Sequence, residues 1–145
     1  MIDNFTGKYF FLSNFYKHPI MFEGLKYPSS EHAYQASKTL YPDVKQQCLY
    51  MSCGECKKWG RNIKMRDDWN NVKLKIMRTI LNIKFSDLKL KSLLLETSSE
   101  ELIEGNTWND TYWGVCNSKG SNHLGKLLME IRQSFQNEDI LKELI

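Results

Sequence analysis

The sequence contains no run of roughly 18 apolar residues, and its N-terminus has no basic segment followed by an apolar one. The first absence excludes a membrane-spanning helix, and the second argues against a secretory signal peptide. We therefore expect a cytoplasmic protein (in the host cytoplasm if a phage encodes it) with no membrane partner. In that compartment the four cysteines are expected to be free thiols.

A strong charge bias and a complete metal-binding motif are also missing. Twenty Lys and Arg residues against 17 Asp and Glu give a net charge of +3. That charge suits a phosphate-bearing ligand but lacks the dense basic stripe of a dedicated DNA-binding protein. Cys53 and Cys56 have the spacing of a zinc motif, but no second cysteine or histidine pair accompanies them, so we expect no metal.

Repeats, low-complexity tracts and flexible linkers are absent as well, while hydrophobic residues make up 41% of the chain. A chain of 145 residues with that composition can bury one core, since single domains typically run to roughly 100–150 residues. We predict an α+β fold over residues 1–145, formed by a single helix-rich domain with a small β element.

Short strands are expected at a few places. Residues 9–16 are aromatic-rich and predict a strand that leads into a turn, and residues 20–27 predict a hairpin with Gly24 at a turn position of positive φ. A further strand is expected at residues 101–104. Residues 106–120 are rich in Asn, Gly, Trp and Tyr and are expected to form a loop.

Helices account for most of the remaining chain, because apolar residues recur at helical spacing and capping residues precede them. Ser30 and Asn122 are predicted caps, and Ser52 with Glu55 has capping-box spacing. Lys84 is expected on a solvated helix face. The predicted helices run from Ser30 to before Pro42, over residues 43–51 and 52–60, from residue 67 or 68, from residues 86–87, from residue 122, and over residues 139–144.

One polar helix face is a candidate site. Glu31, Tyr34, Gln35 and Lys38 are spaced so that they share one face of the predicted helix, with Glu31 in the first turn, where the helix dipole favours a carboxylate. The face could hold a ligand, or it could be an ordinary solvated stripe. His32 points elsewhere and is expected to be structural.

Two other segments could contact a polar ligand or an anion. Ser13 and Asn14 lie at a predicted turn, from which their side chains could make hydrogen bonds. Arg61, Lys64 and Arg66 precede a helix N-terminus, where an anion would be held by the cations and the backbone amides together. The alternative is an ion-pair cluster with the aspartates that follow.

The loop over residues 106–120 combines aromatic and acidic residues. The tryptophans Trp108 and Trp113, with Tyr112, offer a flat stacking surface beside the carboxylate of Asp110. Asp110 could instead only cap a turn. Downstream, Gly125 would allow another backbone or a phosphate to approach closely.

Taken together, these segments resemble the NADAR (YbiA-like) family. The resemblance follows the order of the chain and covers nearly all of it. Its matching pieces are residues 9–16, 27–38, 60–61, 66–69, 84–85, 94–97, 102–104, 110–114 and 122–129, together with Met77.

The resemblance implies an α+β fold and N-glycosidase chemistry without a metal or redox cofactor. Family members are associated with hydrolysing riboflavin-pathway intermediates and with removing ADP-ribose from guanine in DNA. A small molecule and ADP-ribosylated DNA are therefore both implied as substrates, and any protein partner stays open. Carried over by position, Glu31 matches the acid of the family's EHxYQ segment, Trp69 its DW, and Asp110 and Trp113 its DxxWG. Cys116 departs from the pattern, where a glycine is expected.

Under this interpretation two carboxylates assist the breaking of a ribose–nitrogen bond. Glu31 is assigned to the sugar, where it stabilises the developing cation or activates water. Asp110 is assigned to orienting the ribose or assisting the leaving group, although the two roles could be exchanged. Trp113 would stack on the heterocycle with Tyr112 or Trp69. The residues expected to bind substrate are Ser13, Asn14, Tyr34, Gln35, Lys38, Arg61, Trp69, Tyr112, Trp113, Gly114, Asn122 and Lys126, of which Lys38, Arg61 and Lys126 are candidates for phosphate contacts.

Two other classes of function stay open on the sequence alone. A non-catalytic module that binds ADP-ribose or NAD would use the same aromatic loop and basic residues, with Glu31 mattering only for affinity. A plain DNA-binding protein would need a much stronger charge bias.

Overall fold

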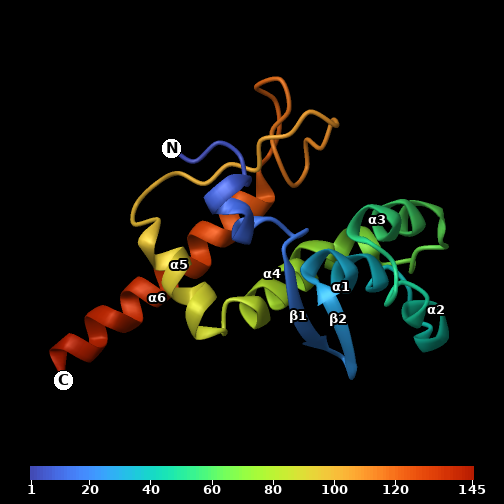
Figure 1. Ribbon diagram of the computed structural model, residues 1–145, viewed down its shortest axis with the longest axis horizontal. Coiled ribbons are helices and arrows are strands. Elements are labelled where there is room, and N and C mark those ends of the chain that lie inside the picture. Colours follow the sequence, from blue (N-terminus) through green and yellow to red (C-terminus); the bar gives the residue numbers. More distant parts are fainter. The chain divides into compact units, whose positions relative to one another are not determined.

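The computed structural model describes all 145 residues, and the chain divides into two compact units. The central unit is Asn14–Lys84, and the terminal unit is Met1–Ser13 with Phe85–Ile145. Most of the regular structure is helical, with one two-stranded sheet (Figure 1). The predicted helix-rich α+β class with a small β element is therefore confirmed, whereas the domain boundaries predicted at residues 1 and 145 stay a prediction.

The central unit begins with the predicted hairpin. Strands β1 (Lys17–Phe22) and β2 (Leu25–Ser29) pair antiparallel, and the turn between them consists of Glu23 and Gly24. Both turn residues have positive φ, 49° and 85°. Such a turn has the twist that two paired strands need. The hairpin and the role of Gly24 are confirmed.

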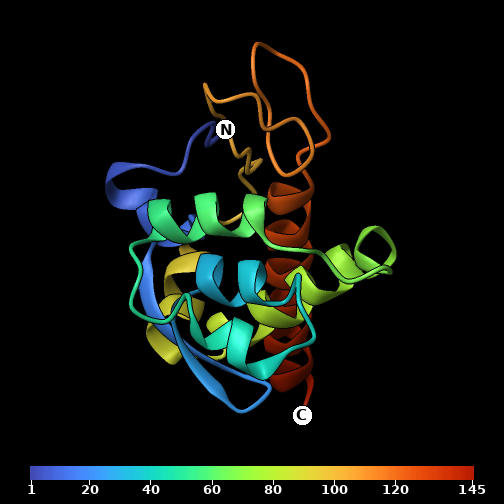
Figure 2. The same ribbon diagram turned by 90° about the vertical axis from the view of Figure 1, so that its right-hand side faces the viewer.

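Four helices complete the central unit: α1 (Ser30–Ala36), α2 (Pro42–Gln46), α3 (Cys53–Asn62) and α4 (Trp69–Lys84). Helix α1 follows β2 directly, and all seven of its residues are buried. Helix α3 lies alongside α1 in both ribbon views (Figures 1 and 2), and α4 contacts both α1 and β1. Helix α1 is thus surrounded, and neighbours on several sides position its side chains.

The start of α1 differs by one residue from the prediction. Ser29, not Ser30, is the cap: its backbone is extended and its side-chain oxygen accepts a hydrogen bond from the backbone N–H of His32. The hydroxyl of Ser30 instead donates to the side-chain oxygen of Asn14, at 2.9 Å. Ser30 already has helical geometry, so its side chain is turned away from the amides that a cap satisfies.

Other helix ends in the central unit follow their capping residues. The capping box of Ser52 and Glu55 begins α3, as predicted. Helix α1 ends at Ala36, well before Pro42, and α2 begins with that proline and is shorter than predicted. A proline suits the first position of a helix, because its missing N–H would have no helical partner there.

The last residue of α4 contradicts the prediction of a solvated position. Lys84 is only 1% exposed, and its ammonium lies 5.7 Å from the centre of the Tyr16 ring. A cation over an aromatic face is stabilised by the ring quadrupole. Helical spacing alone does not reveal this contact, because the ring comes from a segment distant in the sequence.

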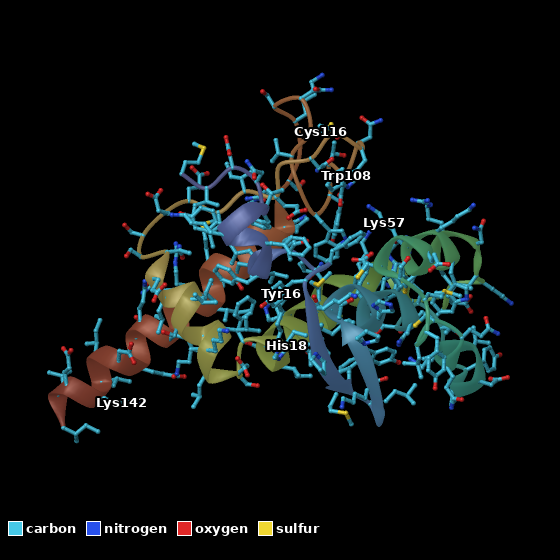
Figure 3. The ribbon with its side chains drawn as sticks, in the orientation of Figure 1. Tyr16, His18, Lys57, Trp108, Cys116 and Lys142 are labelled. Atoms are coloured by element: carbon cyan, nitrogen blue, oxygen red, sulfur yellow. The ribbon has the colours of Figure 1, made fainter.

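Helices α5 (Leu88–Glu96) and α6 (His123–Leu144) form the body of the terminal unit and pack against each other (Figure 1). Helix α6 continues without a break through residues 139–144, so the separate last helix predicted there is wrong. Lys142, labelled in Figure 3, lies on the last turn of this long helix. None of the protein's helices has both the length and the apolarity that a membrane span requires.

Two strand predictions in the terminal unit are wrong. Residues 7–12, which overlap the predicted strand 9–16, form a 3₁₀ helix, η1 (Gly7–Leu12). Its adjacent residues Phe11 and Leu12 are both buried, which the alternating faces of a half-buried strand do not allow. The strand predicted at residues 101–104 is reduced to one bridge between Ile2 and Leu102.

The loop predicted over residues 106–120 is confirmed, and its backbone is folded on itself. Gly105 is bridged to Val115, and Cys116 is bridged to Lys119. Figure 3 shows the loop between α5 and α6 with its side chains drawn. Because backbone hydrogen bonds close it at two places, the loop can hold side chains at defined positions.

Candidate active site

The polar face of α1 is buried and hydrogen-bonded. Glu31 lies in the first turn, as predicted, and is 6% exposed. The side-chain amide of Gln35 donates to its carboxylate, with 2.8 Å between Nε2 and Oε1. Tyr34 on the same face is 7% exposed. The alternative of a solvated stripe is therefore wrong, although the shared face itself is confirmed.

Gln35 also touches helix α3. Its Oε1 is buried and has no hydrogen-bond partner. A Cβ added to Gly60 would lie 1.9 Å from that oxygen, so the amide rests directly against the glycine backbone. A buried carbonyl oxygen without a donor costs about 1–3 kcal/mol. The structure keeps the amide in this orientation despite that cost, because the other end of the amide is bound to Glu31.

Lys38 completes the α1 face at its C-terminal end. Its ammonium donates to the backbone carbonyl of Gly60 at 3.4 Å and lies 5.8 Å from the centre of the Tyr34 ring. Burial lowers the pKa of Lys38, while the carboxylate of Glu31 opposes that change and the charge of Arg61 adds to it. The carboxylate and both cations are therefore close enough to influence one another.

Trp69 packs against the α1 face from the start of α4. Its ring centre lies 5.2 Å from that of Tyr34, at an interplanar angle of 52°, and its side chain is 4% exposed. This is the packing role that is simplest for a tryptophan. Stacking of Trp69 on a substrate stays a prediction.

Asn14 ties the start of α1 to the residues before the hairpin. Its backbone carbonyl accepts from the N–H of Glu31 at 3.0 Å, and its side-chain nitrogen donates to the sulfur of Met77 at 3.7 Å. The hydroxyl of Ser30 donates to its side-chain oxygen. The predicted ligand contact of Asn14 stays a prediction, but its present contacts position the segment that carries Glu31. Ser13, in the terminal unit, follows η1 as its C-terminal cap residue.

The basic segment that begins in the last turn of α3 is divided between two arrangements. Arg66 forms an ion pair with Asp68, with 2.6 Å and 3.0 Å between their hydrogen-bonding atoms. For this arginine the ion-pair alternative is confirmed. Arg61 lies exposed in the last turn of α3, and Lys64 follows it outside the helix. Of this segment, Arg61 is the residue whose charge affects the α1 face, where burial and, to a lesser degree, this charge lower the pKa of Lys38.

His32 and the cysteines near it make internal contacts. Nε2 of His32 lies 2.7 Å from the carbonyl oxygen of Met51, so it carries the hydrogen, and Nδ1 accepts from the hydroxyl of Ser29 at 2.7 Å. Cys53 lies 4.0 Å from Nδ1, while the thiol of Cys56 is hydrogen-bonded to another cysteine. No three His, Cys, Asp or Glu residues gather as a metal would require.

In the terminal unit, Asp110 organises the loop that follows it. Its Oδ1 accepts from the backbone N–H of Tyr112 at 3.2 Å and from that of Trp113 at 2.9 Å. The turn-capping geometry considered for Asp110 is therefore present. Because only one of its two oxygens makes these bonds, capping and a chemical role are compatible.

Asn106 supports this turn and is absent from the predicted site. Its side-chain oxygen accepts from the backbone N–H groups of Trp108 and Asp110, and its side-chain nitrogen donates to the carbonyl of Asp110 at 2.8 Å. An asparagine at the start of such a loop is a sequence signal for turn formation, because its side chain readily bonds to nearby backbone groups.

The aromatic residues of the loop form a cluster that includes a histidine at the start of α6. The ring centre of Tyr112 lies 4.8 Å from that of Trp113 and 4.4 Å from that of His123. Burial raises the pKa of the Tyr112 hydroxyl, so it stays protonated and able to donate. The predicted stacking residues Tyr112 and Trp113 are thus neighbours. The contact of His123 with Tyr112 was not predicted from the sequence.

Asn122 does not cap α6 with its side chain, contrary to the prediction. Its backbone is left-handed, and its side chain accepts from the N–H of Glu104 at 3.0 Å and donates to the carbonyl of Leu102 at 2.9 Å. A left-handed backbone turns the side chain away from the first helical amides and toward this neighbouring segment. Substrate binding by Asn122 stays a prediction.

Gly114 and Gly125 both lie against backbone rather than open space. A Cβ on Gly114 would lie 2.1 Å from the carbonyl oxygen of Glu104, and one on Gly125 would lie 2.1 Å from that of Leu102. The close approach predicted at Gly125 is therefore that of another backbone. Lys126 follows it and is exposed.

Most of the predicted site residues thus gather in two groups, to which Ser13, Asn14, Gly114, Asn122 and Lys126 do not belong. The α1 cluster of the central unit brings together Glu31, Tyr34, Gln35, Lys38 and Trp69, with Arg61 close by. The loop cluster of the terminal unit brings together Asp110, Tyr112 and Trp113, with His123 added. The action of both clusters on one sugar stays a prediction.

Comparison with known proteins confirms the resemblance. The chain matches the NADAR domain model over residues 3–136. It is 40% identical over 131 residues to the N-glycosidase YbiA of Shigella boydii, covering 87% of this chain and 81% of that protein. It is 35% identical over 133 residues to a riboflavin biosynthesis protein of Vibrio vulnificus, covering 87% of this chain and 35% of that protein.

A solved structure has the same fold. The NMR structure of the Escherichia coli protein YbiA matches with a TM-score of 0.82 and 36% identity, and the match covers 97% of this chain and 89% of that chain.

Proposed function

The chain belongs to the NADAR domain family and is an N-glycosidase, and from that premise we propose that it hydrolyses the ribose–nitrogen bond of an ADP-ribose-type or related nucleoside compound. Two substrates are proposed: ADP-ribose attached to guanine in DNA, and an intermediate of the riboflavin pathway. The observation that carries the proposal is the buried Glu31 carboxylate, oriented by Gln35 and accompanied by Lys38.

The chemistry needs a carboxylate beside the sugar. As the C1′–N bond breaks, its electron pair leaves with the nitrogen and positive charge develops on C1′. A water oxygen then bonds to C1′, and the leaving nitrogen gains a proton. We assign Glu31 to the sugar side, because an ionised carboxylate stabilises that cation or accepts the proton of the attacking water. Its burial strengthens either effect, since little solvent screens it.

The loop cluster supplies the second set of roles in this proposal. Asp110 orients the ribose or assists the leaving nitrogen, and the exchange of these roles with those of Glu31 is a variant of the same proposal. Trp113 and Tyr112 stack on the heterocycle, as neighbouring aromatic rings can. Lys38, Arg61 and Lys126 are the proposed phosphate contacts. Arg61 and Lys126 are exposed, which suits a charged group that arrives from solvent.

The two proposed substrates have different support. The name of the relative from Vibrio vulnificus favours a riboflavin-pathway intermediate, a small molecule. The ADP-ribosylated base in DNA is supported by the family resemblance and by the mildly basic chain, with its net charge of +3. A cytoplasmic location belongs to the same proposal and is checked by cell fractionation.

A parallel hydrolysis assay tests the function. The protein is incubated with DNA carrying ADP-ribosylated guanine and, separately, with a ribosylated riboflavin intermediate, and the products are separated by chromatography. Release of free ADP-ribose from the first, or of ribose phosphate from the second, identifies the substrate. Tight binding of ADP-ribose without any product would instead support a binding module, and the hydrolase proposal would be abandoned. Unmodified DNA and heat-denatured protein are the controls.

A further inference from the structure

We propose that Gln35 is a positioning residue, whose side-chain amide holds the Glu31 carboxylate in its reactive orientation, and that Gly60 of α3 provides the space this amide needs. The inference rests on the proposed function and deepens it. It gives Gln35 a different role from the substrate contact expected from the sequence, because the nitrogen of its amide already donates to Glu31 within the protein.

The orientation of the Gln35 amide follows from its contacts. Nε2 lies 2.8 Å from a carboxylate oxygen of Glu31, and that oxygen is an acceptor when ionised. Rotating the amide by half a turn would place its own oxygen against the carboxylate, which brings two acceptors together. The donor end therefore faces Glu31, and the oxygen end faces α3.

Gly60 is the residue of α3 that meets the oxygen end. A Cβ at this position would lie 1.9 Å from Oε1 and 2.7 Å from Cδ of Gln35. Atoms that close cannot coexist, so any larger residue would force the amide away from its present place. Gly54 on the same helix has nothing within 4 Å of its added Cβ. The requirement for glycine is thus local to the contact with Gln35.

The same glycine also contacts the cation of the α1 cluster. Its backbone carbonyl accepts from the ammonium of Lys38, whose pKa responds to the charge of Glu31. Gly60 therefore contacts two side chains of the α1 cluster: Gln35 lies where its Cβ would be, and Lys38 binds its carbonyl. Gln35 is only 5% exposed, so its amide could turn toward a substrate only by releasing Glu31.

A double-mutant cycle of unfolding free energies tests the contact between Gly60 and Gln35 independently of catalysis. Gly60→Ala is expected to lower the folded-to-unfolded ratio by about tenfold or more, because overpacking against a buried amide displaces it. In the Gln35→Ala background the contacts with Oε1 and Cδ are gone and only the Cβ contact at 3.2 Å stays. The same substitution is therefore expected to cost much less there, close to the cost of Gly54→Ala, the matched control. An equal loss from Gly60→Ala in both backgrounds would overturn the contact as the reason for the glycine.

Kinetics of Gln35 variants test the positioning role. Gln35→Leu removes the donor while keeping a side chain of similar volume, and kcat is expected to fall by about 10²-fold with KM nearly unchanged, since a misplaced catalytic group costs about that much. Gln35→Met provides a second apolar replacement if the leucine is not tolerated. Circular dichroism and thermal melting show whether each variant is folded.

Gln35→Glu provides the readout that a purely structural role would not change. Its protonated carboxyl group can donate to Glu31, so activity is expected to recover toward wild type at acidic pH. As pH rises the added group ionises, the two carboxylates repel, and activity is expected to fall. Gln35→Leu, which has no titrating group, is expected to lose the same factor at every pH.

The outcomes separate this inference from the function on which it rests. A wild-type protein that hydrolyses neither substrate overturns both. An active wild type with folded Gln35→Leu and Gln35→Met variants within about threefold of its kcat overturns the positioning role alone. A pH profile of Gln35→Glu that parallels that of Gln35→Leu has the same consequence.

Discussion

Glu31 and Asp110 are the two carboxylates of the proposed mechanism, and they are held in different ways. Glu31 is 6% exposed and receives a hydrogen bond from a side chain one helical turn away. Asp110 is partly exposed and receives two hydrogen bonds from the backbone of its own loop. The Glu31 carboxylate is thus contacted by a side-chain amide that rests on a neighbouring helix, whereas the Asp110 carboxylate is built into a turn.

This difference predicts how substitutions in each cluster affect activity and stability. A change at Gln35 or Gly60 misplaces Glu31 while α1 stays a helix, because the helix has its own cap and packing. A change in the loop cluster alters the backbone itself, because Asp110 and Asn106 hold the turn through main-chain groups. Substitutions of Glu31 or Gln35 should therefore lose activity before stability, whereas substitutions that remove the main-chain hydrogen bonds of the loop cluster should lose both together.

The largest effect is expected from the charge of Glu31. Glu31→Gln keeps the size of the side chain and its place beside Gln35 but removes the negative charge, so kcat is expected to fall by about 10²–10⁴-fold. Thermal melting should change little by comparison. Product release per unit time, measured on whichever substrate the wild-type protein hydrolyses, checks the prediction. Unchanged turnover in a folded variant would remove Glu31 from the mechanism.

A stability effect is expected next, in the loop cluster. Gly114→Ala would bring a Cβ to 2.1 Å from the carbonyl oxygen of Glu104, and backbone cannot move aside as a flexible side chain can. We expect the free energy of unfolding to fall by about 1–3 kcal/mol or more. Urea denaturation measures it, with Gly54→Ala as the control that has open space. A variant as stable as this control would show that the loop yields easily.

Asp110 itself distinguishes turn capping from chemistry. Asp110→Asn keeps an oxygen that can accept from the two backbone N–H groups but removes the charge, whereas Asp110→Ala removes both. The alanine variant is expected to lose about 1 kcal/mol of stability, as for a lost cap. The asparagine variant is expected to stay stable and lose turnover by about tenfold or more. Full turnover in Asp110→Asn would leave capping as the whole role of this residue.

The smallest expected effect concerns the charge of Lys38. Its pKa is lowered in the folded protein, chiefly by burial, whereas in the unfolded chain it stays near 10.5. Between those two values the unfolded chain binds the extra proton, so the contribution of Lys38 to stability rises as pH increases through that window. In Lys38→Met this contribution is absent.

Denaturation curves measured at several alkaline pH values check the sign. The stability of wild type relative to Lys38→Met should increase as pH approaches 10.5. A stability difference that decreases over this range contradicts a lowered pKa for Lys38.

Local features of the fold were predictable because they depend on neighbours in the sequence. The turn of Glu23 and Gly24, the capping box at Ser52 and the shared face of Glu31 and Gln35 follow from short-range geometry. The predictions that were wrong concern features that depend on packing rather than on neighbours in the sequence. The aromatic residues before the hairpin have the composition of a strand but make 3₁₀ turns, since the burial of adjacent residues overrides alternation.

The candidate site was predictable in its members more than in its contacts. Spacing along one helix identified Glu31, Tyr34, Gln35 and Lys38. Nothing in that spacing indicated that the face would be buried or that Gly60 would lie against the Gln35 amide. His123 was missed in the same way, because its ring meets Tyr112 only once the loop is folded.

By itself, the sequence determined the family, the helix-rich α+β class and the residues that line one side of α1. Each of these depends on residue identity or on the fixed repeat of a helix or hairpin. Only the tertiary structure decided that Glu31 is buried beside a partner amide, that Gly60 must lack a side chain and that Lys84 rests on a ring. Those contacts join different elements, and packing between elements follows from the whole folded chain.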